Sequence, residues 1–289
     1  METSRAEYTK HTQEVVYTPD AHLGFGWHVW REMARELIQG RELMWRLFLR
    51  DLSARYRQSV FGYVWAVMPA IVTVVTFTYL KGSGTLPIGQ TNMPYPAYVL
   101  LGMSVWQLFA TGLTRMTQSL VQASAIITKI NFSRETLVLA AFGESVFNFL
   151  IRIVLIGVVF AWYRVVPVWT IIFVPFMLIP LALMTVGFGF IMSIANGVFR
   201  DIGNSLTLVL TFAMFLTPVI YPPPTQWPKV LINYLNPVSP FIIATRDLTT
   251  KGTLSQPDGL FYASIAGLVV FLAAWRIFHL AMSRIAERV

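Results

Sequence analysis

The chain has 289 residues, of which 55% are hydrophobic and only 12% are charged, and its mean hydropathy is +0.59. A soluble domain carries about twice that share of charged residues, so the composition excludes a soluble globular protein and indicates an all-α, polytopic membrane protein. The absence of cysteine excludes disulfides, thiolate metal sites and a cysteine nucleophile. The formal net charge of +8 is explained by lysine and arginine gathered on the cytoplasmic side of a membrane, so we do not expect nucleic acid as a partner.

Residues 1–26 are polar, with no positively charged start followed by an apolar core, so we expect a disordered extension and no cleavable signal. Residues 27–58 place apolar side chains on one face and six or more arginines largely elsewhere. This pattern predicts an amphipathic helix in the cytoplasmic membrane surface, with its arginines toward lipid phosphates. A plain juxtamembrane anchor fits the same pattern.

Residues 59–289 form the predicted transmembrane domain. About 20 residues at 1.5 Å each cross the hydrocarbon core, and hydropathy with length predicts six such helices. We place the spans near 61–80, 96–116, 136–162, 168–196, 202–221 and 258–280.

The distribution of lysine and arginine predicts the orientation. With the N-terminus inside, 16 of the 22 basic residues fall in cytoplasmic regions, and Arg152 lies within a span. The outer regions hold five, which are Lys81, Arg164, Lys229, Arg246 and Lys251. We therefore expect a multi-pass protein of a bacterial inner membrane with both termini cytoplasmic.

The cytoplasmic loop 123–135 combines an apolar patch with charges on a short helix. A partner protein could grip such a helix in a groove, although a helix lying on the membrane surface is an equally simple interpretation. The candidate coupling residues are Ile126, Ile127, Lys129, Ile130, Arg134 and Glu135.

Within the third span, Glu144, Asn148 and Arg152 follow one another at intervals of four residues and so share one helix face. Charged groups inside a membrane normally face the bundle interior or a cavity. The stripe predicts either a buried structural network, with Glu144 facing Arg152 and Arg115, or a surface that contacts cargo.

Between the fifth and sixth spans, residues 217–252 contain seven prolines, which remove backbone donors and interrupt helices. Two short helices remain, near 226–235 and 240–250. Both are too apolar for a solvated loop and too short to cross a bilayer. Irregular backbone at that depth survives only beside protein or a water-filled cavity, so 226–250 are predicted to be re-entrant gate helices at the outer mouth of a pathway.

Aromatic side chains are dense near the outer ends of the spans. Most are typical of the membrane-interface belt, but aromatic rings also stack on the C–H faces of sugars. The candidate pathway residues are Trp106, Phe109, Tyr221, Trp227, Tyr234 and Phe241.

Enzymatic sites find little support. Gly84 to Thr91 imitates a phosphate-binding loop, but Gln90 replaces the required lysine. The four histidines lie toward the two ends of the chain and suggest no metal site or cofactor. An intramembrane glycosyl- or acyltransferase would need convergent acids or histidines, and only Glu144 qualifies. Powered transport would therefore require a separate ATPase.

Several segments in order resemble the permease subunit of ABC-2-type polysaccharide exporters, which move O-antigen, capsule and teichoic acid. Arg50-Asp51 with Arg55-Tyr56-Arg57 leads from the surface helix into the first span, and Lys129 to Glu135 falls where the coupling helix ends. The later landmarks are Phe199-Arg200-Asp201, Pro218 to Tyr221, and Asn236-Pro237 through Pro240.

The resemblance implies the ABC-2, or type V exporter, fold and a homodimer bound to two ATP-binding subunits, which supply ATP and Mg²⁺. It also implies a pathway between the two permeases for an undecaprenyl-linked polysaccharide. Arg50, Arg55 and Arg57 are then candidates for the lipid headgroup, because paired arginines match phosphate oxygens. A permease for a small lipid or drug is the alternative.

Overall fold

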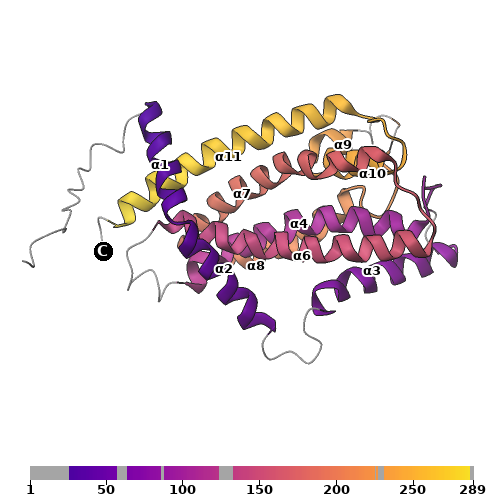
Figure 1. Cartoon of the computed structure of the whole chain (residues 1–289), viewed down its shortest axis with the longest axis horizontal. Coiled ribbons are helices and arrows are strands. Elements are labelled where there is room, and N and C mark those ends of the chain that lie inside the picture. Colours follow the sequence, from indigo (N-terminus) through magenta and orange to yellow (C-terminus); the bar gives the residue numbers. More distant parts are fainter. Residues whose placement is uncertain are drawn as a thin grey trace, which may run out of the picture.

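The computed structural model describes residues 26–56, 64–85, 88–123, 133–224, 226 and 231–286. Throughout these residues the regular structure is helical (Figure 1). The elements are α1 (Trp27–Gln39), α2 (Arg41–Tyr56), α3 (Val64–Gly82), α4 (Tyr95–Gln122), α6 (Arg134–Trp162), the 3-10 helix η2 (Trp169–Phe173), α7 (Val174–Val198), α8 (Asp201–Leu216), α9 (Leu231–Leu235), α10 (Ser239–Thr250) and α11 (Pro257–Ala286).

Four long helices, α4, α6, α7 and α11, run along the long axis of the molecule (Figure 1). Each is long and apolar enough to cross a membrane, α7 together with the preceding η2. Their most extensive packing joins α4 to α6, α4 to α7 and α7 to α11. The four predicted spans at 96–116, 136–162, 168–196 and 258–280 are therefore confirmed as membrane-compatible helices.

The helices at the two remaining predicted spans are shorter. Helix α3 has 19 residues and α8 has 16, and α8 ends at Leu216 rather than at the predicted position 221. Pro218 explains this end, because it lacks an N–H and disfavours helical backbone at Thr217. At 1.5 Å per residue, α8 covers about 24 Å, less than the hydrocarbon core of about 30 Å.

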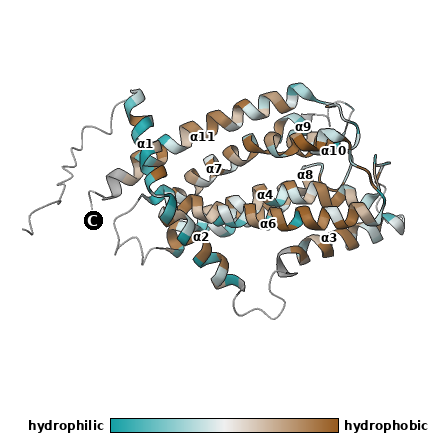
Figure 2. Ribbon diagram, in the orientation of Figure 1, coloured by the Kyte–Doolittle hydropathy of each residue, from teal (hydrophilic) through white to brown (hydrophobic). Residues whose placement is uncertain are grey.

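Helix α4 lies at the centre of the packing. One apolar cluster surrounds its first half and includes Trp106, Leu181 and Phe241, and a second surrounds its last half and includes Met116, Phe190 and Phe278. Hydrophobic residues dominate the long helices, whereas α1 is largely hydrophilic (Figure 2). The core is thus continuous along α4.

The predicted amphipathic helix at 27–58 is two helices rather than one. The break falls at Gly40, where a Cβ atom would lie only 2.6 Å from the Oγ1 atom of Thr136 on α6. The side chain of Phe48 packs on Gly143 of α6, and the Trp30 ring meets the Trp275 ring of α11 edge to face at 5.9 Å. Both helices lie at the end of the molecule that holds the C-terminus (Figure 1).

The predicted gate helices lie at the opposite end (Figure 1). Helix α9 occupies only 231–235 of the first predicted gate helix, and 225 and 227–230 lie outside the described residues. Helix α10 agrees with the second within one residue, and every residue from Ser239 to Thr249 is buried. The extension 1–25 and most of the coupling loop, 124–132, also lie outside the described residues.

Candidate functional site

A stripe of polar side chains follows α4. From Leu101 to Leu120, the positions that are not buried are Gln107, Thr111, Thr114, Arg115 and Gln118, and every one is polar or charged. Their spacing of three or four residues places them on one face of the helix, and exposed Gln122 continues it. A face toward lipid would carry apolar side chains, so this polar stripe faces something other than lipid.

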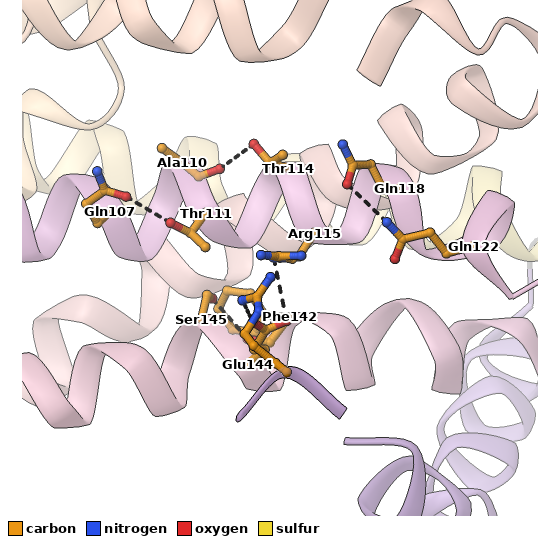
Figure 3. A network of polar contacts seen from close by, with 11 residues as sticks. Gln107, Ala110, Thr111, Thr114, Arg115, Gln118, Gln122, Phe142, Glu144 and Ser145 are labelled. Atoms are coloured by element: carbon orange, nitrogen blue, oxygen red, sulfur yellow. Dashed lines mark hydrogen bonds and ion pairs between the residues drawn. The ribbon is translucent and has the colours of Figure 1, made fainter. Parts of the chain in front are cut away.

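The threonine and glutamine side chains of the polar stripe form hydrogen bonds along α4, whereas Arg115 reaches across to α6 (Figure 3). Thr111 donates to the side chain of Gln107 at 2.9 Å, and Gln122 donates to that of Gln118 at 3.2 Å. Thr114 donates to the Ala110 carbonyl at 2.9 Å. Because these bonds stay within α4, they orient the side chains without closing the surface.

The last half of the polar stripe meets a charge cluster formed by Arg115 of α4, Glu144 of α6 and Arg55 of α2. The Arg115 Nε atom lies 3.5 Å from one carboxylate oxygen of Glu144, and the Arg55 guanidinium pairs with the other (Figure 3 labels Arg115 and Glu144). The Glu144 side chain is 9% exposed, whereas those of Arg55 and Arg115 are 32% and 30% exposed. Two positive groups thus face one buried carboxylate.

The predicted stripe on α6 is buried along its whole length. Glu144, Asn148 and Arg152 are 7%, 5% and 5% exposed. The ion pairs of Glu144 reach Arg115, as expected, and Arg55, which was expected to face lipid. The stripe therefore joins α6 to α2 and α4, and its two predicted roles, a structural network and a surface that contacts cargo, stay predictions.

At the end of the molecule that holds α1 and the C-terminus, Glu135 joins the start of α6 to α11. One Glu135 carboxylate oxygen lies 2.8 Å from the Nδ1 atom of His279, and the other accepts the hydroxyl of Ser133. Both Glu135 and His279 are buried. The start of α6, where the predicted coupling loop ends, is therefore linked to α11, which α1 also contacts.

At the opposite end, Arg246 of α10 joins α4 to the segment that follows α8. Its guanidinium donates to the carbonyl oxygens of Pro218 at 2.6 Å, Val219 at 2.5 Å and Tyr98 at 3.2 Å, and to the Tyr98 hydroxyl at 2.8 Å. The guanidinium carbon lies 3.5 Å from the centroid of the Tyr98 ring. We call these contacts of Arg246 the outer clasp, after the predicted orientation of the chain.

Burial lowers the pKa of Arg246 to about 10, so the guanidinium still carries its charge at neutral pH. Gly102 makes the approach possible, because a Cβ atom there would lie 2.3 Å from a guanidinium nitrogen of Arg246 and 2.7 Å from the Val219 carbonyl oxygen. Tyr95 adds a hydrogen bond of 2.9 Å to the Ile220 carbonyl. The outer clasp thus holds residues 218–220 against α4.

The family of ABC-2 type transporters matches residues 42–249, which is more than half of the chain. The chain belongs to this family. The family match and the four long apolar helices agree with the resemblance to an ABC-2-type permease that the sequence shows.

Three relatives carry the name O-antigen export system permease protein RfbA. The one from Myxococcus xanthus is 25% identical over 260 residues, which cover 89% of this chain and 99% of the relative. Two from Klebsiella pneumoniae are 29% and 27% identical, and each match covers 82% of this chain and 91% of the relative. This ABC-2 family member therefore matches these permeases over nearly their whole length.

The arginines predicted to meet a lipid headgroup are separated in this ABC-2 family member. Arg50 pairs with the adjacent Asp51 at 2.8 Å on the exposed side of α2, whereas Arg55 reaches into the charge cluster. Arg57 lies outside the described residues.

Of the predicted coupling residues, Ile126, Ile127, Lys129 and Ile130 lie outside the described residues. Arg134 and Glu135 both reach α11, since the Arg134 guanidinium lies 3.5 Å from the sulfur of Met282. The sequence did not single out His279 as a partner, because a histidine 144 positions away from Glu135 leaves no local pattern.

Three of the aromatic side chains predicted to line a pathway are core residues. Trp106, Phe109 and Phe241 are 3%, 7% and 0% exposed, so in this conformation they present almost no surface to cargo. Trp106 and Phe109 lie away from the polar stripe because each residue turns the helix by about 100°.

The other predicted aromatics differ from these. Tyr234 is 51% exposed and Tyr221 is half-buried. Trp227 lies outside the described residues. Among the described residues, no group of three or more His, Asp or Glu side chains could hold a metal ion.

Proposed function

We propose that this chain is the permease subunit of an ATP-driven exporter that moves a lipid-linked polysaccharide, such as O-antigen, across the inner membrane. Two copies form the pathway, and two ATP-binding subunits supply the energy from ATP and Mg²⁺. Membership of the ABC-2 family and the names of the three relatives support this assignment.

The observation that carries the proposal is the polar stripe on α4. Glutamine and threonine side chains donate and accept hydrogen bonds, as the hydroxyl groups of a sugar chain do. Such side chains are costly against lipid, so they fit a wet pathway completed by a second copy. An apolar cargo would be matched by an apolar wall instead.

The inner end supplies a route for the energy. Closure of the ATP-binding subunits pushes the coupling helix at 123–135, whose last residue, Glu135, contacts His279 of α11. Because α1 and α2 pack on α11 and α6, the push moves these elements together. The re-entrant gate helices then open the outer mouth.

Replacement of stripe residues tests the proposal. In a strain that lacks its own copy of the gene, the double variant Thr111→Val/Gln118→Leu keeps the side-chain volumes but removes hydrogen bonds. We expect glycan at the cell surface to fall about tenfold, since each lost hydrogen bond contributes about 0.5–1.5 kcal/mol. Immunoblotting of surface glycan measures the change.

Thr185→Val is the matched control, because it makes the same change in α7, where the hydroxyl is fully buried and bonds within its own helix. Wild-type glycan in the stripe variant would contradict the role of the stripe. Absence of any glycan defect in the gene deletion, with export of a lipid or drug instead, would favour the alternative cargo.

A further inference from the structure

The charge cluster holds more positive charge than its carboxylate requires. Arg55 and Arg115 come from helices far apart in the sequence and converge on opposite oxygens of Glu144. Two guanidiniums against one carboxylate leave one net positive charge. The next acidic group along α2, Asp51, is held by Arg50 at 2.8 Å.

A single arginine would neutralise Glu144, so the three charged groups together carry one surplus positive charge. The two arginines are also the least buried members of the cluster, at 32% and 30% exposure against 9% for Glu144. The surplus positive charge is therefore on the accessible side, and the negative charge lies behind it.

An anion with several oxygens fits this arrangement. The planar guanidinium donates paired hydrogen bonds to phosphate oxygens, and two guanidiniums match a pyrophosphate better than they match one carboxylate. Arg115 also belongs to the polar stripe, so a phosphate held there would leave an attached sugar beside Thr111 and Gln118.

We propose that Arg55 and Arg115 bind the pyrophosphate of a polyprenyl-linked glycan, and that Glu144 holds the two arginines until the pyrophosphate displaces it. This inference rests on the proposed function for the identity of the cargo. It adds Arg115 as a ligand and gives Glu144 the role of an internal counter-anion that competes with the cargo.

A binding experiment on the full chain in nanodiscs of phosphatidylcholine tests the inference, with a long-chain polyprenyl pyrophosphate as the probe. We expect Arg115→Gln to raise Kd about tenfold and Arg115→Lys to raise it less, because lysine keeps the charge and loses the fork. Glu144→Gln should lower Kd about threefold or more, because it removes the competing anion. Native mass spectrometry measures the bound fraction.

The effect of Glu144→Gln separates binding from structural support, since loss of a purely structural carboxylate would weaken binding or leave it unchanged. Either of these results would overturn the inference. Should Glu144→Gln fail to fold, the difference between Arg115→Gln and Arg115→Lys decides, and equal Kd values for these two variants would refute a phosphate contact.

Arg46→Gln is the matched control. Arg46 lies on the same helix as Arg55, pairs with Glu42 and is 74% exposed, so this change removes one positive charge away from the cluster. Its Kd should equal that of the wild type. An equal rise in Kd would mean that the overall charge of α2 draws the lipid, and the proposed site would be wrong.

Two competitors distinguish the possible sources of phosphate. Sodium pyrophosphate should displace the probe, whereas phosphatidylglycerol at equal concentration should displace it much less. Equal displacement by phosphatidylglycerol would identify a general site for anionic lipid and overturn the inference.

The two proposals can fail separately. Glycan export by cells that carry Arg115→Gln, at the wild-type rate and with an unchanged Kd, would refute the pyrophosphate site and leave the proposed function intact. Absence of glycan export by the wild-type chain would refute the proposed function, whatever the chain binds in nanodiscs.

Discussion

Arg246 satisfies backbone carbonyl groups that no helix can satisfy. Pro218 and Val219 follow the end of α8, where the chain leaves the helix at depth in the molecule. Irregular backbone in such a place needs donors from elsewhere, and one guanidinium provides several. The outer clasp therefore supplies the hydrogen-bond donors that the backbone needs where α8 ends at Leu216.

Arg246→Ala should lower the free energy of unfolding by about 3 kcal/mol, because it leaves buried carbonyl oxygens without a donor. Arg246→Lys should have an intermediate effect, since it restores the charge and not the fork. Thermal unfolding of the purified protein in detergent measures both changes.

Arg164→Gln is the control for loss of a positive charge at the same end, because Arg164 is exposed. Gly102→Ala should reproduce the loss of stability although Arg246 itself is unchanged, because the new Cβ atom would collide with the Arg246 guanidinium. Unfolding of Arg246→Ala at the wild-type temperature would show that the outer clasp does not stabilise the fold.

Sequence patterns could not predict the outer clasp. In the sequence Arg246 is only one basic residue of a predicted outer region, and its partner Tyr98 lies 148 residues away. The same holds for Glu135 and His279 at the inner end. Local periodicity identifies which face of a helix is polar, but not which distant group that face meets.

At the scale of the helices, hydropathy and length predicted α4, α6, α7 and α11. A long apolar run is a local property of the sequence, so these helices could be found without knowing what packs against them. The face of α4 was missed for the opposite reason. Its apolar and aromatic residues were conspicuous in the sequence, whereas packing by α6 and α7 decides which residues remain uncovered.

The break between α1 and α2 depends on the close approach of Gly40 to α6. Gly40→Ala should destabilise the protein by about 1–3 kcal/mol, because the new methyl group would overlap the Thr136 hydroxyl. Adding Thr136→Ala should restore most of this loss, since it removes the colliding atom. A double-mutant cycle based on thermal unfolding measures the coupling.

Gly157→Ala in α6 is the matched control, because a Cβ atom at that position meets nothing within 4 Å. It should leave stability unchanged or raise it slightly. Additive effects of Gly40→Ala and Thr136→Ala would mean that the two residues do not touch.

On the scale of the whole molecule, the two ends are built differently. The end predicted to lie inside joins α1, α2, α6 and α11 around Glu135 and Gly40, whereas the end predicted to lie outside joins α4 and α10 around Arg246. The polar stripe runs between them along α4. In the proposed mechanism a push at one end reaches the other through α4, α6, α7 and α11, which form the most extensive packing of the described residues.

The proposed orientation can be tested directly, because the chain contains no cysteine. Ser83→Cys and Thr253→Cys lie at exposed positions of the predicted outer loops, and Arg200→Cys lies in the exposed turn between α7 and α8. A membrane-impermeant maleimide should label the first two in intact spheroplasts and the third only after permeabilisation. Labelling in the reverse pattern would invert the proposed topology.

The outer clasp also limits how these proteins can be recombined. A chimera that replaces α10 of this chain with the helix of a relative would remove Arg246 and leave the Tyr98 hydroxyl and the carbonyl oxygens of Pro218 and Val219 in place. Transplanting Ser239–Thr250 into a relative should succeed only if Tyr98 and Gly102 travel with it, because spatial contact rather than a loop boundary defines the unit of this chain that can be exchanged.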